Sequence, residues 1–368
     1  MPEAGLFPQS TYERRLKKLR LKQRQNKCPH SLFTSPENRR YYSGFTGADS
    51  GPTDSAGALL ITPDRQYLLT DSRFTEAAKN EAPLFEVVLV KNGLAKTVAK
   101  LGSFSEGLGI ESEILTVEVY HALRKALSAP LIKLPFSRQL RMVKDASELA
   151  LMKKALAITE EAMGMLWAEL KPGWTEAQAA RFMDRTFREL GAEGVAFETI
   201  VASGPQAALP HARPGSKVIQ KGELVVIDCG ARYQGYCSDI TRMFMVGRPS
   251  SWQKKIYRVV REAQLKAVKA LGPKKIGAEV HQVAFDHIDQ AGFGRNFGHS
   301  LGHGVGLAIH ETPNLSPNNR EPLPVGAVVT VEPGIYLPGQ GGVRLEQMAV
   351  ITKTGCLLLN QDNHFYDF

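Results

Sequence analysis

Two aspartates, Asp228 and Asp239, lie eleven residues apart in a stretch where apolar runs flank a polar turn. A hairpin that turns at Tyr233 and Gln234 would place Asp228 directly opposite Asp239, with Cβ atoms about 4.5–5.5 Å apart. Two buried like charges at that separation destabilise a fold unless a cation compensates them. The pair therefore predicts a metal ion. The alternative, two exposed aspartates of a surface hairpin, is disfavoured by the apolar flanks.

Three histidines, His299, His303 and His310, lie in a glycine-rich segment between Phe297 and Glu311. The four-residue spacing of His299 and His303 is that of a helical zinc motif. That motif needs a glutamate where this chain has Ser300, and the glycines disfavour a helix. We expect instead a loop that brings imidazoles close to a ligand. The alternative is that they are ordinary core histidines.

Two further acidic residues lie in apolar strand-like runs. Glu332 ends Val328-Val-Thr-Val331, and Glu346 lies before Met348-Ala-Val-Ile351. A carboxylate in such a run is costly unless it is paired or coordinated. Arg344 could pair with Glu346, but residues two apart on a strand share a face, so Arg344 could equally line the same cavity.

Together these residues form an oxygen-rich donor set of carboxylates with one imidazole. Such a set suits a pair of manganese, cobalt, iron or zinc ions better than one tetrahedral structural zinc. Two metal ions about 3.5–4 Å apart can share a hydroxide and polarise a carbonyl, which is the chemistry of amide hydrolysis. The candidate ligands are Asp228, Asp239, His303, Glu332 and Glu346.

The elements around these residues contain a weak internal repeat. A predicted helix over residues 147–170 stops at Pro172, and a second helix over 175–190 is ended by Gly191. The same pattern recurs 101 residues later, where Leu271, Pro273 and Gly292 take the places of Leu170, Pro172 and Gly191. A duplication would give two similar halves that face each other, with a site at their junction.

The N-terminal part alternates helix and strand signals. A basic helix is expected over residues 11–27, followed by strands over 58–62, 67–70 and 85–90, the last of the buried kind. Residues 44–57 are rich in Gly, Ser, Asp and Pro and are expected to form a loop. We therefore expect an α/β (α+β) protein with one domain over residues 1–140 and a second over residues 141–368.

Composition excludes several classes. No apolar run approaches the roughly 20 residues of a membrane span, and the first residues resemble no secretory signal. The four cysteines form no metal or disulfide spacing, which predicts a reducing cytoplasm. The net charge of +9 is concentrated in the first predicted helix, and a solvated helix face is the favoured interpretation. No nucleic-acid partner is expected, and an acidic partner is the alternative.

These motifs resemble the pita-bread metallopeptidases of family M24. The carriers are Asp228 and Asp239, then Gly-His-Ser-Leu-Gly-His303-Gly-Val-Gly-Leu, then Val-Glu332-Pro-Gly and Gly-Val-Arg-Leu-Glu346. The pattern is most similar to Xaa-Pro aminopeptidases and Xaa-Pro dipeptidases. Residues 38–47 and 70–74 resemble the creatinase-like N-terminal domain of that branch, so the resemblance covers nearly the whole chain. It implies a pita-bread catalytic domain with pseudo-twofold halves, and a homodimer.

The resemblance also implies roles for the ligands. Asp228 and Asp239 would hold one metal, with Asp239 bridging, and His303 and Glu332 would hold the second, while Glu346 bridges both. Glu332 would also act as general base. Manganese is the first expectation, with cobalt, zinc or iron as alternatives.

Four residues outside the cage would contact the substrate. His211 and His310 would steady the substrate amide and the tetrahedral intermediate, and His299 would line the proline pocket. Arg344 would bind the substrate close to the bridging carboxylate. The substrates would be peptides with proline in second position, whose tertiary amide lacks the N–H that other peptidases recognise.

Two positions depart from the family pattern. Gln347 replaces an acidic residue, and Asn314 replaces an arginine that holds a free substrate carboxylate in many dipeptidase-like relatives. The second departure favours an Xaa-Pro aminopeptidase, with an Xaa-Pro dipeptidase as the alternative. A metal-free creatinase-like hydrolase or a non-catalytic binding protein of this fold would be expected to have lost the cage.

Overall fold

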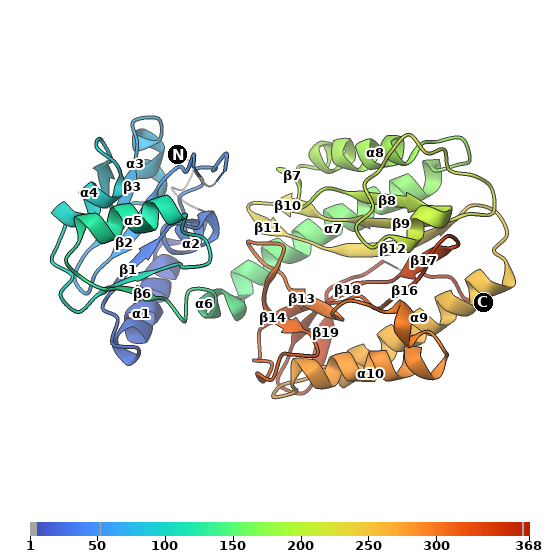
Figure 1. Cartoon of the computed structure of the whole chain (residues 1–368). Helices are drawn as coiled ribbons and strands as arrows, with labels where there is room; N and C mark the ends of the chain where they lie inside the picture. The colour runs from blue at the N-terminus through green and yellow to red at the C-terminus, as the bar shows by residue number, and fades with distance from the viewer. Residues whose placement is uncertain (1–5, 52, 363) are drawn as a thin grey trace. The chain divides into compact units, whose positions relative to one another are not determined.

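The chain divides into two units, Met1–Arg141 and Met142–Phe368, in a computed structural model that describes residues 6–51, 53–362 and 364–368. Figure 1 shows both units with their elements labelled. In the described residues no helix combines the length and the apolar character that crossing a bilayer requires.

The first unit is an α/β domain. Its elements are α1 (Gln9–Gln25), β1 (His30–Phe33), α2 (Pro36–Ser43), β2 (Ala58–Ile61), β3 (Gln66–Thr70), α3 (Thr75–Glu81), β4 (Glu86–Leu89), α4 (Leu94–Lys100), β5 (Leu108–Ile110), α5 (Val117–Ala126), β6 (Leu131–Lys133) and α6 (Gln139–Met142).

One mixed sheet organises this unit, in the order β4-β3-β2-β1-β5-β6. The strand β2 runs antiparallel to β1 and β3, and the other neighbours are parallel. Every residue of β2 is buried, because helices cover both faces of the sheet. The expectation of a buried strand at residues 85–90 is wrong. The strand β4 is an edge strand whose residues are exposed or half-buried.

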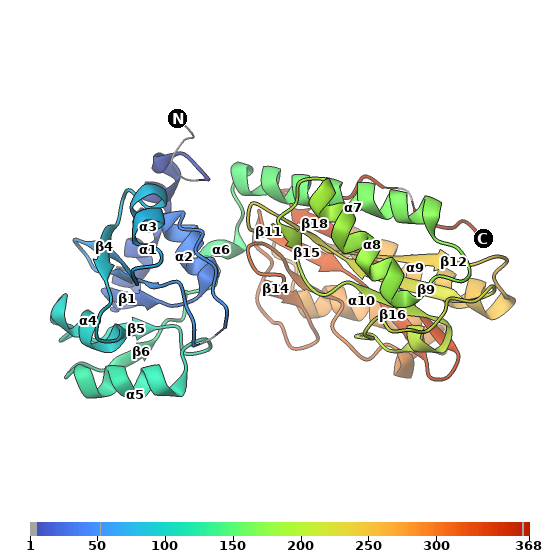
Figure 2. The same ribbon diagram turned by 90° about the horizontal axis from the view of Figure 1, so that it is seen from above.

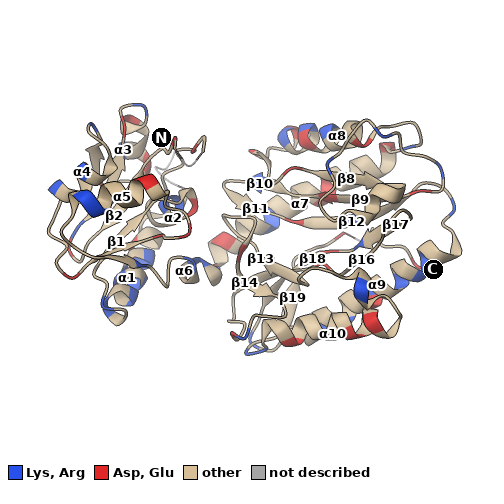
Figure 3. Ribbon diagram, in the orientation of Figure 1, with Lys and Arg blue, Asp and Glu red and all other residues tan. Residues whose placement is uncertain are grey.

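The basic helix α1 exposes most of its charged side chains. Figure 3 shows the positions of its Lys and Arg residues in blue. Arg15 is the exception to the expected solvated face. It is buried, its guanidinium lies 4.1 Å from the centroid of the Tyr41 ring, and it donates to the Tyr41 carbonyl at 2.9 Å. Another arginine, Arg39, organises the loop over residues 44–57. Its buried guanidinium donates to the Gly47 and Gly57 carbonyls and to Asp49.

The second unit contains the residues expected to do chemistry. Its elements are α7 (Ala146–Glu169), α8 (Glu176–Glu189), β7 (Gly194–Val195), β8 (Ile200–Ser203), η1 (Gly204–Ala208), β9 (Leu224–Cys229), β10 (Ala231–Tyr233), β11 (Tyr236–Cys237), β12 (Ile240–Met245), α9 (Ser251–Ala270), α10 (Gly277–Gln290), η2 (Gly294–Asn296), β13 (Gly302–Gly304), β14 (Glu311–Leu315), β15 (Val328–Val331), β16 (Gly334–Leu337), β17 (Gly341–Arg344), β18 (Gln347–Ile351) and β19 (Cys356–Leu358).

The internal repeat is present in the structure. The first half pairs α7 and α8 with the sheet β12-β9-β8, and the second pairs α9 and α10 with the sheet β14-β13-β15-β18-β19. Leu170 and Leu271 cap the long helices, and Gly191 and Gly292 follow the shorter ones with φ of 90° and 88°. Figures 1 and 2 show α8 and α10 in the two halves, and Figure 1 places them on opposite sides of the strands.

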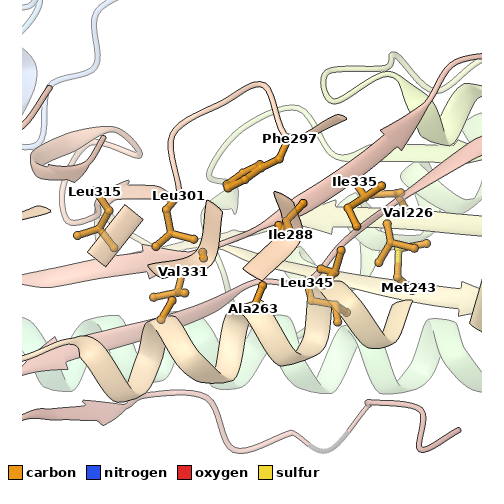
Figure 4. Close-up of a cluster of buried hydrophobic side chains, with 14 of the residues drawn as sticks. Val226, Met243, Ala263, Ile288, Phe297, Leu301, Leu315, Val331, Ile335 and Leu345 are labelled. Carbon is orange, nitrogen blue, oxygen red and sulfur yellow. The ribbon is translucent and has the colours of Figure 1, made fainter. Parts of the chain in front are cut away.

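Two buried clusters form the core of this unit, one within the first half and one between the halves. One packs α7 and α8 against one face of β9. The other fills the space between α9, α10 and the strands of both halves, and Figure 4 shows its side chains, including Val226, Met243, Val331 and Leu345. Since β9 and β12 contribute to both clusters, their alternate residues point toward the junction of the halves.

Candidate metal centre

The two aspartates point toward the junction because of strand alternation. On β9, Val225 and Ile227 pack against the helices of their own half, whereas Leu224 and Val226 belong to the cluster at the junction. Asp228 follows at the same two-residue period, so it shares the junction face. On β12, Met243 and Met245 belong to the junction cluster, and Asp239 shares their parity.

The expected register of this hairpin is wrong by two residues. The turn lies at Gln234 and Gly235, whose φ angles are 46° and 79°, and Asp228 pairs with Thr241 rather than with Asp239. A two-residue turn with both φ angles positive matches the twist of the paired strands, and glycine takes the second position at no steric cost. Because the shift is an even number of residues, both aspartates still face the same side.

The second half supplies His303 on β13. A Cβ atom at Gly302 would lie 2.1 Å from the Thr330 carbonyl oxygen, and one at Gly304 would lie 2.6 Å from the Thr312 oxygen. The flanking glycines therefore let this strand approach its neighbours closely. His303 Nε2 lies 3.5 Å from Asp239 Oδ2 and 3.3 Å from Glu332 Oε1.

All of the predicted site residues line one cavity of about 620 Å³. Within it, Asp239, His303 and Glu346 place donor atoms within 4.8 Å of one another, an arrangement able to hold a metal ion. Glu332 lies directly after β15, and Glu346 lies between β17 and β18. The residues that the structure brings to this cavity are His211, Asp228, Asp239, His299, His303, His310, Glu332, Arg344 and Glu346.

The electrostatics of the cluster favour a cation. Burial raises the pKa of Glu332 to about 8, and burial with the neighbouring carboxylates raises the pKa values of Asp239 and Glu346 well above their usual range. In the described part of the chain, Asp228 Oδ1 and Glu346 Oε1 are buried without a hydrogen-bond partner. Buried polar atoms are normally satisfied, so these two oxygens fit ligands of divalent cations.

His303 is prepared to be a neutral ligand. Its Nδ1 lies 3.1 Å from the Gly304 carbonyl oxygen, which requires the proton on Nδ1 and leaves the Nε2 lone pair facing the carboxylates. Burial, together with nearby His310, lowers its pKa to about 4. The imidazole is therefore uncharged at neutral pH.

Two threonines that the sequence analysis did not single out orient the ligands. Thr241 donates to Glu346 Oε2 at 2.9 Å and accepts from Arg344 Nε. Thr330 donates to Glu332 Oε1 at 3.2 Å and accepts from the His303 backbone N–H. Each lies two residues from a predicted ligand on a strand, so the two-residue period could have found both.

Arg344 is buried and its donors are engaged within the chain. Nη2 donates to Asp228 Oδ2 at 2.6 Å, and Nη1 donates to the Tyr336 hydroxyl at 3.0 Å and to the Pro210 carbonyl. Tyr336 is a further residue that the sequence analysis did not single out. Its hydroxyl lies 3.0 Å from His299 Nε2, and His299 Nδ1 faces the Ser300 carbonyl. Arg344 is thus linked through one hydroxyl to the expected proline-pocket histidine.

The two outer histidines differ in burial. The His310 ring meets the His303 ring edge to face at a centroid distance of 4.4 Å, and burial lowers the pKa of His310. His211 is exposed and lines the same cavity. The ring nitrogens at these positions can form hydrogen bonds beside the cluster.

The chain is similar in sequence and fold to several known proteins. The Xaa-Pro dipeptidase of Pyrococcus furiosus is 36% identical over 350 residues, which cover 94% of this chain and 97% of that protein. The structure of an Xaa-Pro dipeptidase from Bacillus anthracis matches with a TM-score of 0.89 and 37% identity, covering 96% and 98% of the two chains. The X-Pro aminopeptidase structure from Thermotoga maritima gives a TM-score of 0.81 and 38% identity, covering 91% and 96%.

Two families match along the chain. Residues 15–143 match the Creatinase/Prolidase N-terminal domain, and residues 150–353 match Metallopeptidase family M24. The resemblance and the fold class expected from the sequence are both confirmed. With its creatinase-type N-terminal domain, its pita-bread relatives and a cavity that gathers carboxylates and histidines from both halves, the chain belongs to metallopeptidase family M24.

Proposed function

We propose that this protein is a metal-dependent Xaa-Pro peptidase that acts first of all as an Xaa-Pro dipeptidase. The observation that carries the proposal is the group of buried carboxylates and one neutral histidine on the wall of a 620 Å³ cavity. The similarity to two Xaa-Pro dipeptidases over more than nine tenths of the chain supports the substrate class.

The proposed cage consists of the five predicted ligands and would hold two divalent ions. Manganese is the first candidate, with cobalt, zinc or iron as alternatives. Asp239 and Glu346 are the proposed shared ligands. When bound, such ions polarise the scissile carbonyl and make water a stronger acid. The residues Asp228, Asp239, His303, Glu332 and Glu346 fit this role because one cavity gathers their carboxylates and imidazole. Among the described residues, Asp228 Oδ1 and Glu346 Oε1 are buried without a hydrogen-bond partner.

The side chains around the cage divide the remaining work. Glu332, oriented by the Thr330 hydroxyl, is the proposed base that accepts a proton at its carboxylate and passes it to the leaving proline nitrogen. His310 and His211 are the proposed partners of the substrate amide and of the charge that develops on it. A tertiary amide offers no N–H, so the wall needs no acceptor at that point.

His299 and Arg344 take proposed positioning roles. His299 is held by Tyr336 and the Ser300 carbonyl and lines the cavity beside them, where the proline ring is proposed to bind. Arg344 was expected to bind substrate directly. Since its donors already serve Asp228, Thr241 and Tyr336, we propose that it fixes the cage instead.

An Xaa-Pro aminopeptidase is the second candidate. Asn314 lines the cavity without a charge, which suits longer peptides, and the Thermotoga maritima X-Pro aminopeptidase is 38% identical. A homodimer in a reducing cytoplasm remains the expected setting, and none of the four cysteines, all of them in described residues, is in a disulfide.

Hydrolysis of Ala-Pro and Ala-Pro-Ala by metal-stripped protein, with and without manganese, cobalt or zinc, tests the proposal. We expect metal-dependent release of alanine, faster from Ala-Pro. A higher rate on Ala-Pro-Ala would assign the aminopeptidase instead. Absence of turnover on both peptides with every metal would refute the proposed function.

A further inference from the structure

The loop over residues 210–214 carries a second arginine, Arg213, on the cavity wall. Its side chain is exposed, and within the described ranges its guanidinium has no hydrogen bond or ion pair to the chain. An arginine that lines a cavity without a partner keeps all its donors for a ligand. A planar carboxylate is the group that matches this fork of donors.

The other arginine on the cavity wall is not available to bind a carboxylate. Arg344 is buried and committed to protein acceptors at Nε, Nη1 and Nη2. His299 lies against the Tyr336 hydroxyl and the Ser300 carbonyl, and His303 belongs to the proposed cage. His211 and His310 are the proposed partners of the substrate amide. Asn314, also on the wall, is uncharged, and the carboxylates of the cluster repel an anion.

The backbone around Arg213 is held in place. The Pro210 carbonyl accepts from Arg344 Nη1 at 3.2 Å, and Ala212 is buried in the junction cluster. The Gly215 carbonyl accepts from the Ala177 N–H at 3.0 Å. Pro214 further restricts the backbone of Arg213 to extended conformations. The guanidinium therefore extends from a fixed point that is tied, through Arg344, to the cage itself.

We propose that Arg213 binds the free α-carboxylate of a dipeptide substrate and sets the preference for dipeptides over longer peptides. This inference rests on the proposed Xaa-Pro dipeptidase function. In a dipeptide the carboxylate lies one residue beyond the scissile carbonyl, a span of at most about 3.6 Å. The cage and the carboxylate partner must therefore share one cavity, as Arg213 and the cage residues do. In a longer peptide that carboxylate becomes a neutral amide.

Calorimetric titration of manganese-loaded enzyme with L-proline and L-prolinamide tests this role, because the two ligands differ only in the carboxylate. Arg213→Gln should weaken proline binding about ten- to a hundredfold, the range of a charged hydrogen-bonded pair, and change prolinamide binding less than about twofold. Arg213→Lys should retain part of the preference, since it keeps the charge but loses the fork. Arg248→Gln, which removes an exposed arginine that does not line the cavity, is the matched control.

An equal loss of both ligands in Arg213→Gln, or a proline preference that survives the substitution, would overturn the proposal. Survival would assign the carboxylate to another partner. The rates at which wild-type enzyme hydrolyses Ala-Pro and Ala-Pro-amide distinguish failure of the Arg213 proposal from failure of the proposed function. If neither is hydrolysed, the function fails, while the calorimetric contrast between proline and prolinamide still decides the role of Arg213.

Discussion

Glu332 has two proposed roles, metal ligand and general base. One substitution tests the general-base role without disturbing the fold. Glu332→Gln keeps the side-chain volume and the Thr330 contact but removes the proton acceptor. We expect an unchanged circular dichroism spectrum and a kcat on Ala-Pro lower by about 10²- to 10⁴-fold, the usual contribution of a general base. Near-normal kcat in a metal-loaded sample of this variant would remove Glu332 from that role.

The carboxylates of the cage make a second prediction, for the metal-stripped protein. Burial raises the pKa of Glu332 from its ordinary 4.5 to about 8. Between these values the folded chain holds a proton that the unfolded chain has released, so stability falls as pH rises. The melting temperature of stripped protein should therefore decline from pH 5 to pH 8, and saturating manganese should reduce that decline. A melting temperature that rises over this range without metal would contradict the burial of these groups.

At the scale of the element, the close packing of β13 predicts that one added methyl group at Gly302 disturbs the site. A Cβ atom at Gly302 would lie 2.1 Å from the Thr330 carbonyl oxygen, whereas one at Gly298 would have no atom within 4 Å. Gly302→Ala should cost about 1–3 kcal/mol of unfolding free energy and lower metal affinity, because His303 and Thr330 must move. Gly298→Ala is the control and should leave both unchanged. Equal denaturant midpoints for the two variants would show that β13 is not closely packed.

The helices and strands were predicted from the sequence only in part. Alternation predicted that Asp228 and Asp239 share a face, and the spacing of Leu170, Pro172 and Gly191 predicted the repeated helix pair. The register of the hairpin that carries the two aspartates was not predicted, because Gln234 adopts a positive φ that is uncommon for glutamine. The exposed edge position of β4 escaped because sheet order depends on contacts distant in sequence. The hydrogen bonds of Tyr336 depend on the pairing of β16 with β17 and had no signal in local spacing.

At the scale of the whole molecule, the proposed cage joins the two halves of the second unit. Asp228 and Asp239 come from the first half, and His303, Glu332 and Glu346 come from the second. Binding of ions to the folded state alone stabilises it by about 2.7 kcal/mol at a hundredfold excess over Kd. Manganese should therefore raise the melting temperature of stripped protein in a concentration-dependent manner. An unchanged melting temperature at saturating manganese would contradict a cage that bridges the halves.

The measurement that tests the central claim most directly is the metal content of wild-type protein and of Asp239→Ala after loading with manganese and desalting. The account predicts about two ions per wild-type chain and a marked loss in the variant, because Asp239 is a proposed shared ligand. Two ions retained by Asp239→Ala, or none bound by the wild type, would contradict the cage.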